Sequence, residues 1–359
     1  MVAPTKRDSV SLGASAPVMS PDLIRQVAEG VPAKELSYQE AIREALREEM
    51  LRDPSVFLMG EDIGKHGGAF GVTRTLFDQF GAERVLNTPI SENTIVGAAT
   101  GAALVGMRPV IEIMFVDFSG LAMDQICTQA AKLRFMTGGQ CTVPWVLRMP
   151  QGGGAGKSTA AQHSQSLEAW YAHIPGLKVV LPSTPYDAKG LMKAAIRDDN
   201  PVIFLEQKFL YSFRGLVPDA EYVLPLSLCE VKRSGQDVTV VTSGYMVWHA
   251  MLAAELLSRE GISVEVIDVR TIAPLDEETI GRSARKTGRV VLVTEAVRDY
   301  GPANEWGMVV MERAFEYLQA PVKRVTGRTS PIPFANSIES GVWPDTQGVA
   351  QAIRDVAAW

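Results

Sequence analysis

The sequence has 359 residues, 46% of them apolar, so the chain can bury a sizeable core, and its length favours two domains over one. A formal net charge of −6 leaves no positive excess with which to bind a nucleic acid or an anionic membrane, and we expect neither as a partner. No run of about 18 apolar residues is present, so no membrane-spanning helix is expected either.

The cysteines and the first residues of the sequence bear on the cellular compartment. Cys127, Cys141 and Cys229 are odd in number and far apart, which suits neither a disulfide framework nor a zinc site built on paired thiolates. A reducing, cytoplasmic location is therefore expected. Residues 1–36 mix charged residues, proline and serine without an apolar h-region, which indicates a mobile or docking arm and not a signal peptide.

The ordered part is expected to begin with an amphipathic helix, because Ser37 and Glu40 have the spacing of a capping box and apolar residues then recur at helical intervals. Short apolar runs typical of buried strands follow, alternating with segments of helical periodicity. The strands are expected at 56–60, 109–115, 143–148, 178–182 and 201–206, and helices at 92–105, 120–134 and 185–197. This alternation predicts parallel strands with helices on both faces, so residues 37–212 form one α/β domain.

A second domain is predicted after residues 213–236, where proline, glycine and charged residues indicate a linker. Strands are then expected at 237–244, 263–269, 289–295 and 322–327, with helices at 246–259, 277–286 and about 304–318. The predicted fold class is thus α/β, with two doubly wound, mainly parallel sheets, the second in residues 237–359. Neither first strand leads into a G-x-G-x-x-G turn, which argues against a dinucleotide-binding enzyme.

A glycine-rich segment, GGGAGKST at residues 152–159, resembles a phosphate-binding loop. That loop needs four residues between its two outer glycines, and the position that the first glycine would occupy is Gln151. The segment is one residue short, and no helix pattern follows its lysine. We therefore interpret it as a flexible surface loop that leads to His163.

Ligands of doubly wound sheets bind beyond the carboxyl ends of the strands, and the segment TPISEN, residues 88–93, falls at such a place. Glu92 lies in the first turn of the predicted helix. It could simply stabilise the helix dipole, by about 0.3–1 kcal/mol, or it could serve chemistry. Gly97, Gly101 and Gly106 favour the second interpretation, since each glycine costs a helix about 1 kcal/mol relative to alanine and together they suggest a close approach by another backbone or a flat ligand.

Two other features lie at strand ends in the first domain. Phe115 and Phe118 follow a buried strand and could be ordinary core residues or could flank a planar ring. His163, between glutamine and serine, has polar neighbours and the near-neutral pKa range of a proton carrier, although a lone histidine is more often a structural hydrogen-bonding group. His173, at an apolar helix end, is the more ordinary of these two histidines.

Several long segments are recognisable beyond these local patterns. They include GEDIGKHGGAFGVTRTL, RVLNTPISEN, IVGAATGAALVGMRPVIEIMFVDF, DQICTQAAKLRFMTGGQ and AAQHSQSLEAWYAHIPGLKVVLPSTPYDAKGL. From about residue 36 to residue 359 the chain resembles the beta subunit of the thiamine-diphosphate-dependent decarboxylating component of 2-oxoacid dehydrogenase complexes, particularly the pyruvate and acetoin members. The resemblance implies a transketolase-like fold, in which a pyrimidine-binding domain precedes a C-terminal domain.

The resemblance also implies roles for individual residues. Glu92 matches the glutamate that hydrogen-bonds a ring nitrogen of the cofactor's aminopyrimidine and so promotes deprotonation of the thiazolium carbon. Met114 and Phe118 match residues that pack around the aminopyrimidine. His163 matches a histidine near the reacting centre that handles protons and takes part in reductive acyl transfer to a lipoyl group.

Metal and partner expectations follow from the same resemblance. Asp198 and Asn200, with backbone carbonyls near Trp145 and Ala195, match a structural potassium site. Thiamine enzymes hold Mg²⁺ and the diphosphate with a Gly-Asp-Gly motif and a later asparagine, but this chain has no Asp-Gly dipeptide. The metal and diphosphate half of the site is therefore expected from an alpha subunit, in a heterotetramer of two alpha and two beta chains that passes its product to a lipoyl-bearing acyltransferase.

Three functions are thus weighed. The first is an oxidoreductase subunit that decarboxylates pyruvate or another 2-oxoacid, or cleaves acetoin, and transfers the acyl group to a lipoyl domain. A split transketolase is the second, although sugar phosphates call for more basic and histidine side chains than four histidines suggest. The third is a non-catalytic assembly subunit that has kept the fold and lost the activity. The presence of Glu92, Phe118 and His163 argues against this third function.

Overall fold

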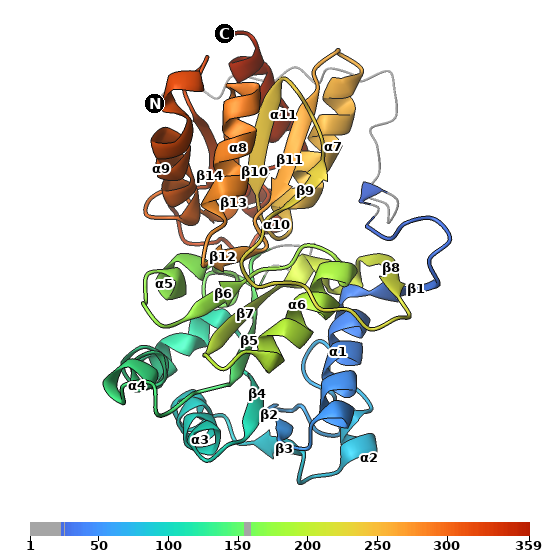
Figure 1. Cartoon of the computed structure of the whole chain (residues 1–359), viewed down its shortest axis with the longest axis vertical. Coiled ribbons are helices and arrows are strands. Elements are labelled where there is room, and N and C mark those ends of the chain that lie inside the picture. The colour runs from blue at the N-terminus through green and yellow to red at the C-terminus, as the bar shows by residue number, and fades with distance from the viewer. Residues whose placement is uncertain (1–22, 25, 154–158) are drawn as a thin grey trace.

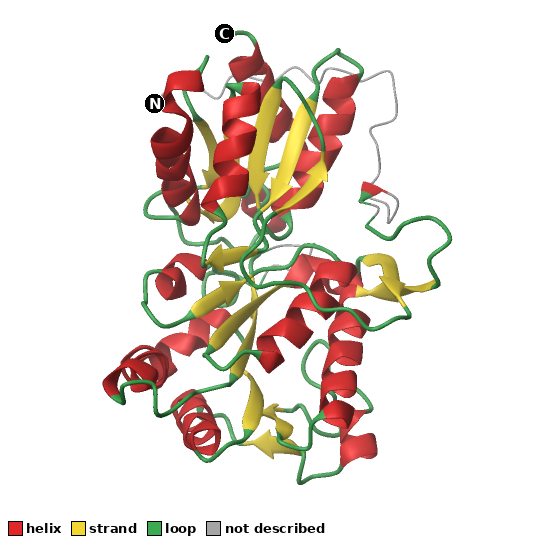
Figure 2. Ribbon diagram, in the orientation of Figure 1, coloured by secondary structure: helices red, strands yellow, loops and turns green. Residues whose placement is uncertain are grey.

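The computed structural model describes residues 23, 24, 26–153 and 159–359, which form two α/β domains one above the other (Figures 1 and 2). The first domain is built on a seven-stranded sheet and the second on a five-stranded sheet. The predicted fold class is confirmed. No helix in these residues is long and apolar enough to cross a membrane.

The seven-stranded sheet has the order β12-β6-β7-β5-β4-β2-β3, and its strands pair in parallel except for the edge strand β12. Strand bounds are β2 Val56–Glu61, β3 Val85–Thr88, β4 Arg108–Glu112, β5 Val146–Gln151, β6 Lys178–Val180, β7 Val202–Gln207 and β12 Thr271–Ala273. Strand β12 comes from the C-terminal half of the chain. The two predicted domains therefore share a sheet edge, which the apolar pattern did not reveal, because three residues are too few to show a period.

Helices cover both faces of this sheet because alternate strand residues point to opposite sides. Residues such as Leu58 and Phe204 share one core with α1 (Tyr38–Arg52) and α6 (Pro185–Arg197). Residues such as Met59 and Leu205 share another with α3 (Glu92–Leu104), on the opposite face. The remaining elements of the domain are α2 Leu76–Phe80, the 3₁₀-helix η2 Val116–Ala122, the π-helix η3 Asp124–Ala130, α4 Ala131–Met136, α5 Glu168–Ala172 and the 3₁₀-helix η4 Lys208–Ser212.

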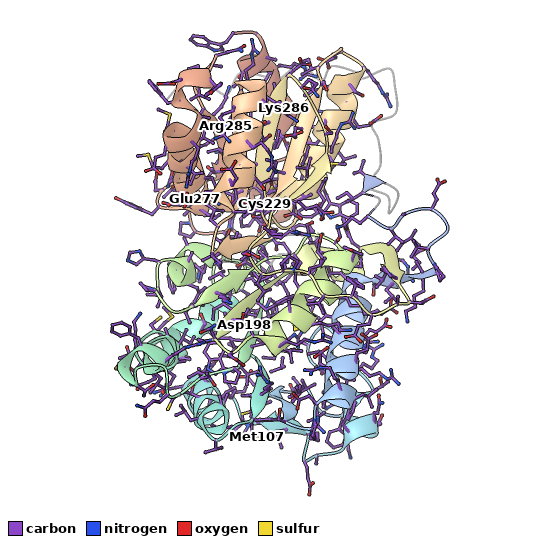
Figure 3. All side chains as sticks on the ribbon, viewed as in Figure 1. Met107, Asp198, Cys229, Glu277, Arg285 and Lys286 are labelled. Carbon is purple, nitrogen blue, oxygen red and sulfur yellow. The ribbon has the colours of Figure 1, made fainter. Side chains whose placement is uncertain are left out.

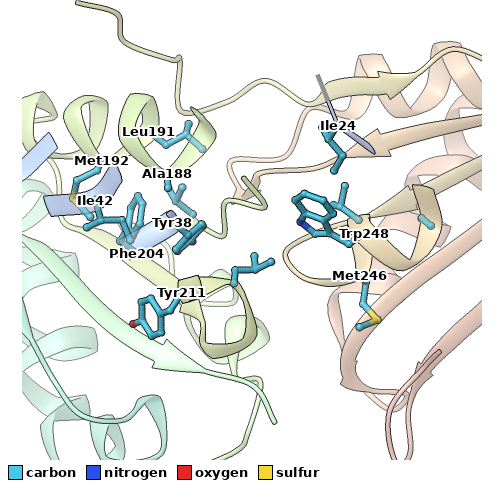
Figure 4. Packing of buried hydrophobic residues seen from close by; sticks show 14 of the residues in the cluster. Ile24, Tyr38, Ile42, Ala188, Leu191, Met192, Phe204, Tyr211, Met246 and Trp248 are labelled. Atoms are coloured by element: carbon cyan, nitrogen blue, oxygen red, sulfur yellow. The ribbon is translucent and has the colours of Figure 1, made fainter. Parts of the chain in front are cut away.

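The five-stranded sheet of the second domain has the order β14-β13-β10-β11-β9, parallel except for β9. Its strands are β9 Glu230–Arg233, β10 Val238–Thr242, β11 Val264–Asp268, β13 Val290–Val297 and β14 Lys323–Gly327. Its helices are α7 Met246–Ser258, α8 Glu277–Thr287, α9 Pro302–Ala314, η5 Phe315–Tyr317, α10 Asn336–Glu339 and α11 Thr346–Ala357. The core continues between the domains: Figure 4 shows Ile42 and Phe204 on one side and Trp248 of α7 on the other.

The predicted arm and linker contain regular structure. Strand β1 (Ala33–Ser37) pairs antiparallel with β8 (Arg214–Pro218), and β9 lies at the end of the predicted linker. Before β1, the Gln26 amide donates to Asp187 at 3.1 Å, so this stretch packs on the first domain. Residues 1–22 and 25 of the predicted arm lie outside the described residues, and the boundaries 1–36 and 213–236 stay predictions.

Candidate functional site

The predicted catalytic and cofactor residues gather at the carboxyl ends of the strands of the first sheet. Glu92 is the first residue of α3, directly beyond β3, and is only 7% exposed. The Ser91 hydroxyl donates to Thr94 Oγ1 at 2.8 Å and does not cap the helix. Among the described residues the Glu92 carboxylate has no hydrogen-bond donor. A largely buried side chain whose carboxylate has no protein donor makes Glu92 a candidate to hold a polar ligand atom.

A second carboxyl group faces the same region from the end of β2. Glu61 Oε1 is buried and has no hydrogen-bond partner in the described part of the chain, and the same is true of Thr88 Oγ1 at the end of β3. Burial raises the pKa of Glu61 to about 7, and the negative charges of Glu92, Asp62 and Glu112 add to the rise. Glu61 is not among the predicted site residues, although its position at a strand end was a usable signal.

Gly97, Gly101 and Gly106 were expected to allow a close approach by another backbone or a flat ligand, and the structure shows such an approach at one of them. A Cβ on Gly97 would lie 3.6 Å from Gln125 of η3, so that glycine does allow a close approach within the chain. Among the residues that the structure describes, Gly101 has no neighbour within 4 Å, and Gly106, with φ +94°, lies beyond the helix end at Leu104. Only one of the three glycines therefore faces a protein neighbour closely.

Aromatic side chains lie beside His163. Strand β4 ends at Glu112, earlier than predicted, and the chain turns through the half-buried Met114 and Phe118 into η2. The His163 ring packs edge-to-face against Phe115 and Phe118, at centroid distances of 5.2 and 5.1 Å. Histidine and aromatic residues predicted from separate stretches are thus in contact.

The backbone of His163 is held by a lysine that sequence reasoning missed. Lys208 Nζ donates to the His163 carbonyl and, at 2.8 Å, to Thr159 Oγ1. The same ammonium group lies 5.1 Å from the Phe115 ring centroid, in a cation–π arrangement. Burial lowers the pKa of Lys208 to about 8, while nearby carboxylates oppose this effect.

Two buried carboxyl groups lie between the domains, close to the same segment. Glu295, on β13 of the second domain, accepts a hydrogen bond from the Gly153 amide at 2.8 Å and one from Gln207 Nε2. Glu168 of α5 accepts one from Gln151 Nε2 at 3.1 Å. Residues 154–158 of the glycine-rich segment, Lys157 included, lie outside the described residues.

Gly152 is expected to tolerate no side chain. Its φ is +84°, and a Cβ would overlap Gln207 Oε1 and lie 2.6 Å from Glu295 Oε1. The matched control is Gly261, whose φ is +81° but which has no neighbour within 4 Å in the described part of the chain. Both alanine variants carry the backbone cost, about 1–2 kcal/mol, so Gly152→Ala should lose about 1–3 kcal/mol more than Gly261→Ala in urea unfolding. Equal losses would show that the contacts do not constrain this glycine.

The pH dependence of stability should reflect Glu295. Burial raises its pKa from 4.5 to about 7, Glu168 adds to the rise, and the Gly153 amide and Lys208 oppose it. The folded state then holds the proton more tightly than the unfolded chain, so stability present in acid is lost as the pH rises from about 4.5 to about 7. The free energy of unfolding of wild type relative to Glu295→Gln should fall by about 3 kcal/mol between pH 4.5 and pH 8, measured by urea unfolding. A difference that does not change with pH would contradict this.

The residues predicted to bind potassium lie elsewhere, at the amino ends of β5 and β7. The Trp145 and Ala195 carbonyls accept backbone hydrogen bonds from Val202 and Asp198 at 3.0 and 3.3 Å. The Asp198 carboxylate pairs with Lys178 and accepts the Asn200 side-chain amide at 2.8 Å. Figure 3 shows Asp198 within the first domain, away from Glu277 and Arg285 of the second.

The protein's own positive charges already lie near these oxygens. Arg108 Nη1 donates to the Asp198 carbonyl at 3.0 Å. Across the described ranges, no group of three or more histidine, cysteine, aspartate or glutamate side chains is placed to hold a metal ion. The three cysteines are free thiols.

Comparisons with known proteins agree on one family. The family models "Transketolase, pyrimidine binding domain" and "Transketolase, C-terminal domain" match residues 34–213 and 228–349. The pyruvate dehydrogenase E1 component subunit beta-2, mitochondrial, of Oryza sativa subsp. japonica is 47% identical, over 90% of this chain and 86% of that protein. The 2-oxoisovalerate dehydrogenase subunit beta of Bacillus subtilis is 46% identical, over 90% of this chain and 98% of that one.

A third relative and two solved structures complete the picture. The acetoin:2,6-dichlorophenolindophenol oxidoreductase subunit beta of Cupriavidus necator is 46% identical, over 90% of this chain and 97% of that protein. A structure described as "Split gene transketolase, inactive beta4 tetramer" superposes with a TM-score of 0.72 at 24% identity, over 92% of this chain and 99% of that chain. A transketolase from Leishmania mexicana has a TM-score of 0.65 at 16% identity, over 93% of this chain and 47% of that chain. At these identities the two structures bear on the fold alone.

Proposed function

Because the chain belongs to the transketolase-like family of beta subunits of 2-oxoacid and acetoin dehydrogenases, we propose that it supplies the pyrimidine-binding half of a thiamine-diphosphate site. In this proposal it acts with an alpha subunit as an oxidoreductase on an oxo donor, either decarboxylating pyruvate or another 2-oxoacid or cleaving acetoin. The acyl group then passes to a lipoyl domain of an acyltransferase. The observation that carries the proposal is Glu92, which is 7% exposed at the start of α3 and whose carboxylate has no donor among the described residues.

The residues present fit the pyrimidine half of the cofactor. When bound, thiamine diphosphate supplies the carbon nucleophile and the electron sink that cleavage next to a carbonyl needs. Glu92 can hydrogen-bond a ring nitrogen of the aminopyrimidine and hold a proton there, since its carboxyl group faces no competing donor among the described residues. Met114 and Phe118 would pack against that ring, and Phe115 and Phe118 shield the same region from water.

His163 is proposed as the second catalytic residue. Its imidazole can give or take a proton at the reacting carbonyl, and its contacts with two phenyl rings fix the plane of the imidazole. The same ring is available for proton transfer when the acyl group moves to the lipoyl sulfur. Lys208 keeps the backbone of His163 in place and adds positive charge close by.

The diphosphate and Mg²⁺ are proposed to bind to the alpha subunit. Gly-Asp-Gly is the motif that supplies their ligands in thiamine enzymes, and the sequence has no Asp-Gly dipeptide. The working assembly is then a heterotetramer of two alpha and two beta chains in a multienzyme complex. Its cytoplasmic location is a proposal that rests on the free cysteines.

Potassium binding near Trp145, Ala195, Asp198 and Asn200 stays a prediction, and no catalytic step depends on it. The carbonyls there keep a second lone pair, but Arg108 already donates to the Asp198 carbonyl and Lys178 already pairs with the Asp198 carboxylate. The split-transketolase alternative has support in fold only, whereas relatives at 46–47% identity are named as dehydrogenase or oxidoreductase beta subunits.

The proposal is tested by purifying the chain together with its alpha subunit and following thiamine-diphosphate-dependent reduction of an artificial electron acceptor. Pyruvate, branched 2-oxoacids, acetoin and sugar phosphates are offered in parallel. Activity with one oxo substrate, absent from either chain alone, is the expected result and names the substrate. A complex that turns over only a sugar phosphate would replace the proposal by the transketolase alternative, and one that binds the cofactor without any turnover would favour an assembly subunit.

A further inference from the structure

A carboxylate from the second domain lies at the base of the segment that carries His163. Glu295 on β13 is 5% exposed. Its Oε1 accepts a hydrogen bond from the Gly153 amide at 2.8 Å and one from the Ser166 hydroxyl at 3.4 Å. Gly153 precedes His163 in the sequence and Ser166 follows it, so a single carboxylate is bonded to described residues on both sides of the histidine. The bonds cross from one domain to the other.

A second set of contacts closes the same base. The Gly152 amide donates to the Gln165 carbonyl at 2.9 Å, and Gln165 Nε2 donates to Asp117 Oδ1, also at 2.9 Å. Asp117 lies in η2, the 3₁₀-helix that also contains Phe118. The backbone on both sides of His163 and the aromatic rings that contact it are therefore held by the same three elements. These are β13, η2 and the end of β5.

Glu295 also reaches His163 along another route. Its Oε2 accepts from Gln207 Nε2 at the end of β7, and the next residue, Lys208, donates to the His163 carbonyl. Within the described residues, no hydrogen bond is made by the imidazole itself. The position of the imidazole ring thus depends on the backbone of His163 and on Phe115 and Phe118. Glu295 holds that backbone through its bonds to Gly153 and Ser166 and through Gln207, the neighbour of Lys208.

From this geometry we infer that Glu295 is a positioning residue for His163, holding the histidine segment of one domain against a strand of the other. The inference rests on the proposed function, in which His163 is the proton carrier. A glutamine at position 295 has one acceptor oxygen where the carboxylate has two, so it cannot accept from both the Gly153 side and the Gln207 side. The histidine backbone would then shift by a fraction of an ångström, and small misplacements of catalytic groups are costly.

The test compares Glu295→Gln, His163→Ala and the double variant in the complex with the alpha subunit. We expect Glu295→Gln to lower kcat for acyl transfer to the lipoyl domain by about 10- to 100-fold with little change in KM for the oxo substrate. If Glu295 acts through His163, the double variant should be no slower than His163→Ala. The control is Glu265→Gln, which removes another buried carboxylate of the second domain, 4% exposed and bonded to Ser283 and Lys286, and should leave kcat unchanged.

Several results would overturn the inference. The first is a double variant whose kcat lies below that of His163→Ala by the same factor by which Glu295→Gln alone lowers kcat. The second is a Glu295→Gln enzyme that is as active as Glu265→Gln. If Glu295→Gln fails to assemble, Ser166→Ala takes its place, because it removes one contact and keeps the carboxylate. We then expect kcat to fall by about 2- to 10-fold in the wild-type background and not in the His163→Ala background. An unchanged kcat in the wild-type background would count against the inference.

Failure of the proposed function would look different. A wild-type complex without turnover would refute that function, and the positioning role would then be read from the His163 ring resonances in NMR spectra of histidine-labelled protein. These should shift in Glu295→Gln and not in Glu265→Gln. Unchanged His163 resonances would overturn the inference independently of activity.

Discussion

Replacing Glu92 by glutamine is expected to lower kcat by about 10²- to 10⁴-fold while the complex with the alpha subunit still assembles and binds thiamine diphosphate. Glutamine has almost the same shape but cannot hold the proton that a carboxylate shares with a ring nitrogen. The side chain is buried at the start of α3 and accepts nothing from the described protein, so its exchange removes no internal hydrogen bond. The fall should therefore be in turnover, with a small effect on stability.

The competing interpretation of Glu92, as a helix-dipole residue, predicts the reverse. Loss of a first-turn carboxylate then costs about 0.3–1 kcal/mol of stability and leaves turnover intact. Glu278 is the matched control, because it is an acidic residue in the first turn of α8 and pairs with Arg285 at 3.1 Å. Steady-state kinetics and thermal unfolding of Glu92→Gln and Glu278→Gln separate the two interpretations. Similar kinetics for both variants would remove Glu92 from the catalytic machinery.

The largest stability effect is expected at Arg148, in the middle of the first sheet. Its guanidinium is 2% exposed, donates to both oxygens of Glu206 at 2.7 and 2.9 Å, and pairs with Glu112. Tyr211 adds a hydrogen bond to Glu206 at 2.7 Å. Two buried carboxylates share this one cation, and burial already raises the pKa of Glu112.

Arg148→Met should lower the free energy of unfolding by about 3–5 kcal/mol, because removing one partner leaves uncompensated buried charge. Methionine keeps much of the arginine stem volume, so the loss reports on charge more than on a cavity. Arg354→Met is the control: Arg354 also binds a carboxylate, that of Glu260 at 2.6 Å, but the pair is exposed and should be worth about 1 kcal/mol or less. Urea unfolding of both variants gives the comparison, and equal losses would contradict the account of the buried cluster.

The effect of Arg148 should extend to the site through ring contacts. Tyr211 stacks on Phe70 at 4.8 Å, Phe70 packs edge-to-face on Phe115 at 5.7 Å, and Phe115 contacts His163. The buried charge cluster is therefore connected to His163 through the rings of Tyr211, Phe70 and Phe115. Loss of its cation is expected to lower activity as well as stability, at temperatures where the variant is still folded.

Much of the fold follows from local signals in the sequence. The capping box at Ser37 and Glu40 forms as predicted, with the Ser37 amide 2.8 Å from Glu40 Oε2, and α1 begins at the next residue. The buried strands of both sheets were predictable because parallel strands covered on both faces are continuous apolar runs. Helices α3 and α6 match their predicted ranges within one residue.

Other elements depend on tertiary structure that the sequence pattern does not express. The predicted helix at 120–134 lies in a succession of a 3₁₀-helix, a π-helix and a short α-helix, a departure from regular α-helix that the apolar pattern does not show. The edge strands β1, β8 and β12 are short and pair across long sequence separations, so their apolar period is too brief to detect.

Some residues of the candidate site could likewise be predicted from the sequence and others could not. The positions of Glu92 and His163 after strands of the first sheet were predictable from the sequence, and their catalytic roles stay proposals. Lys208 and Glu295 were not predicted, since their roles come from bonds to a backbone carbonyl and to a backbone amide in another part of the chain. Glu295 does end the predicted strand at 289–295, so its position at a strand end was a usable signal in the second domain as well.

The most direct measurement of the central claim is the rate of hydrogen–deuterium exchange at the reactive thiazolium carbon of thiamine diphosphate bound to the alpha–beta complex. It needs no substrate and reports on cofactor activation alone. The account predicts fast exchange with wild type and exchange slower by about 10²-fold or more with Glu92→Gln, at equal cofactor occupancy. Equal exchange rates in the two complexes would contradict the claim that this chain provides the activating carboxyl group.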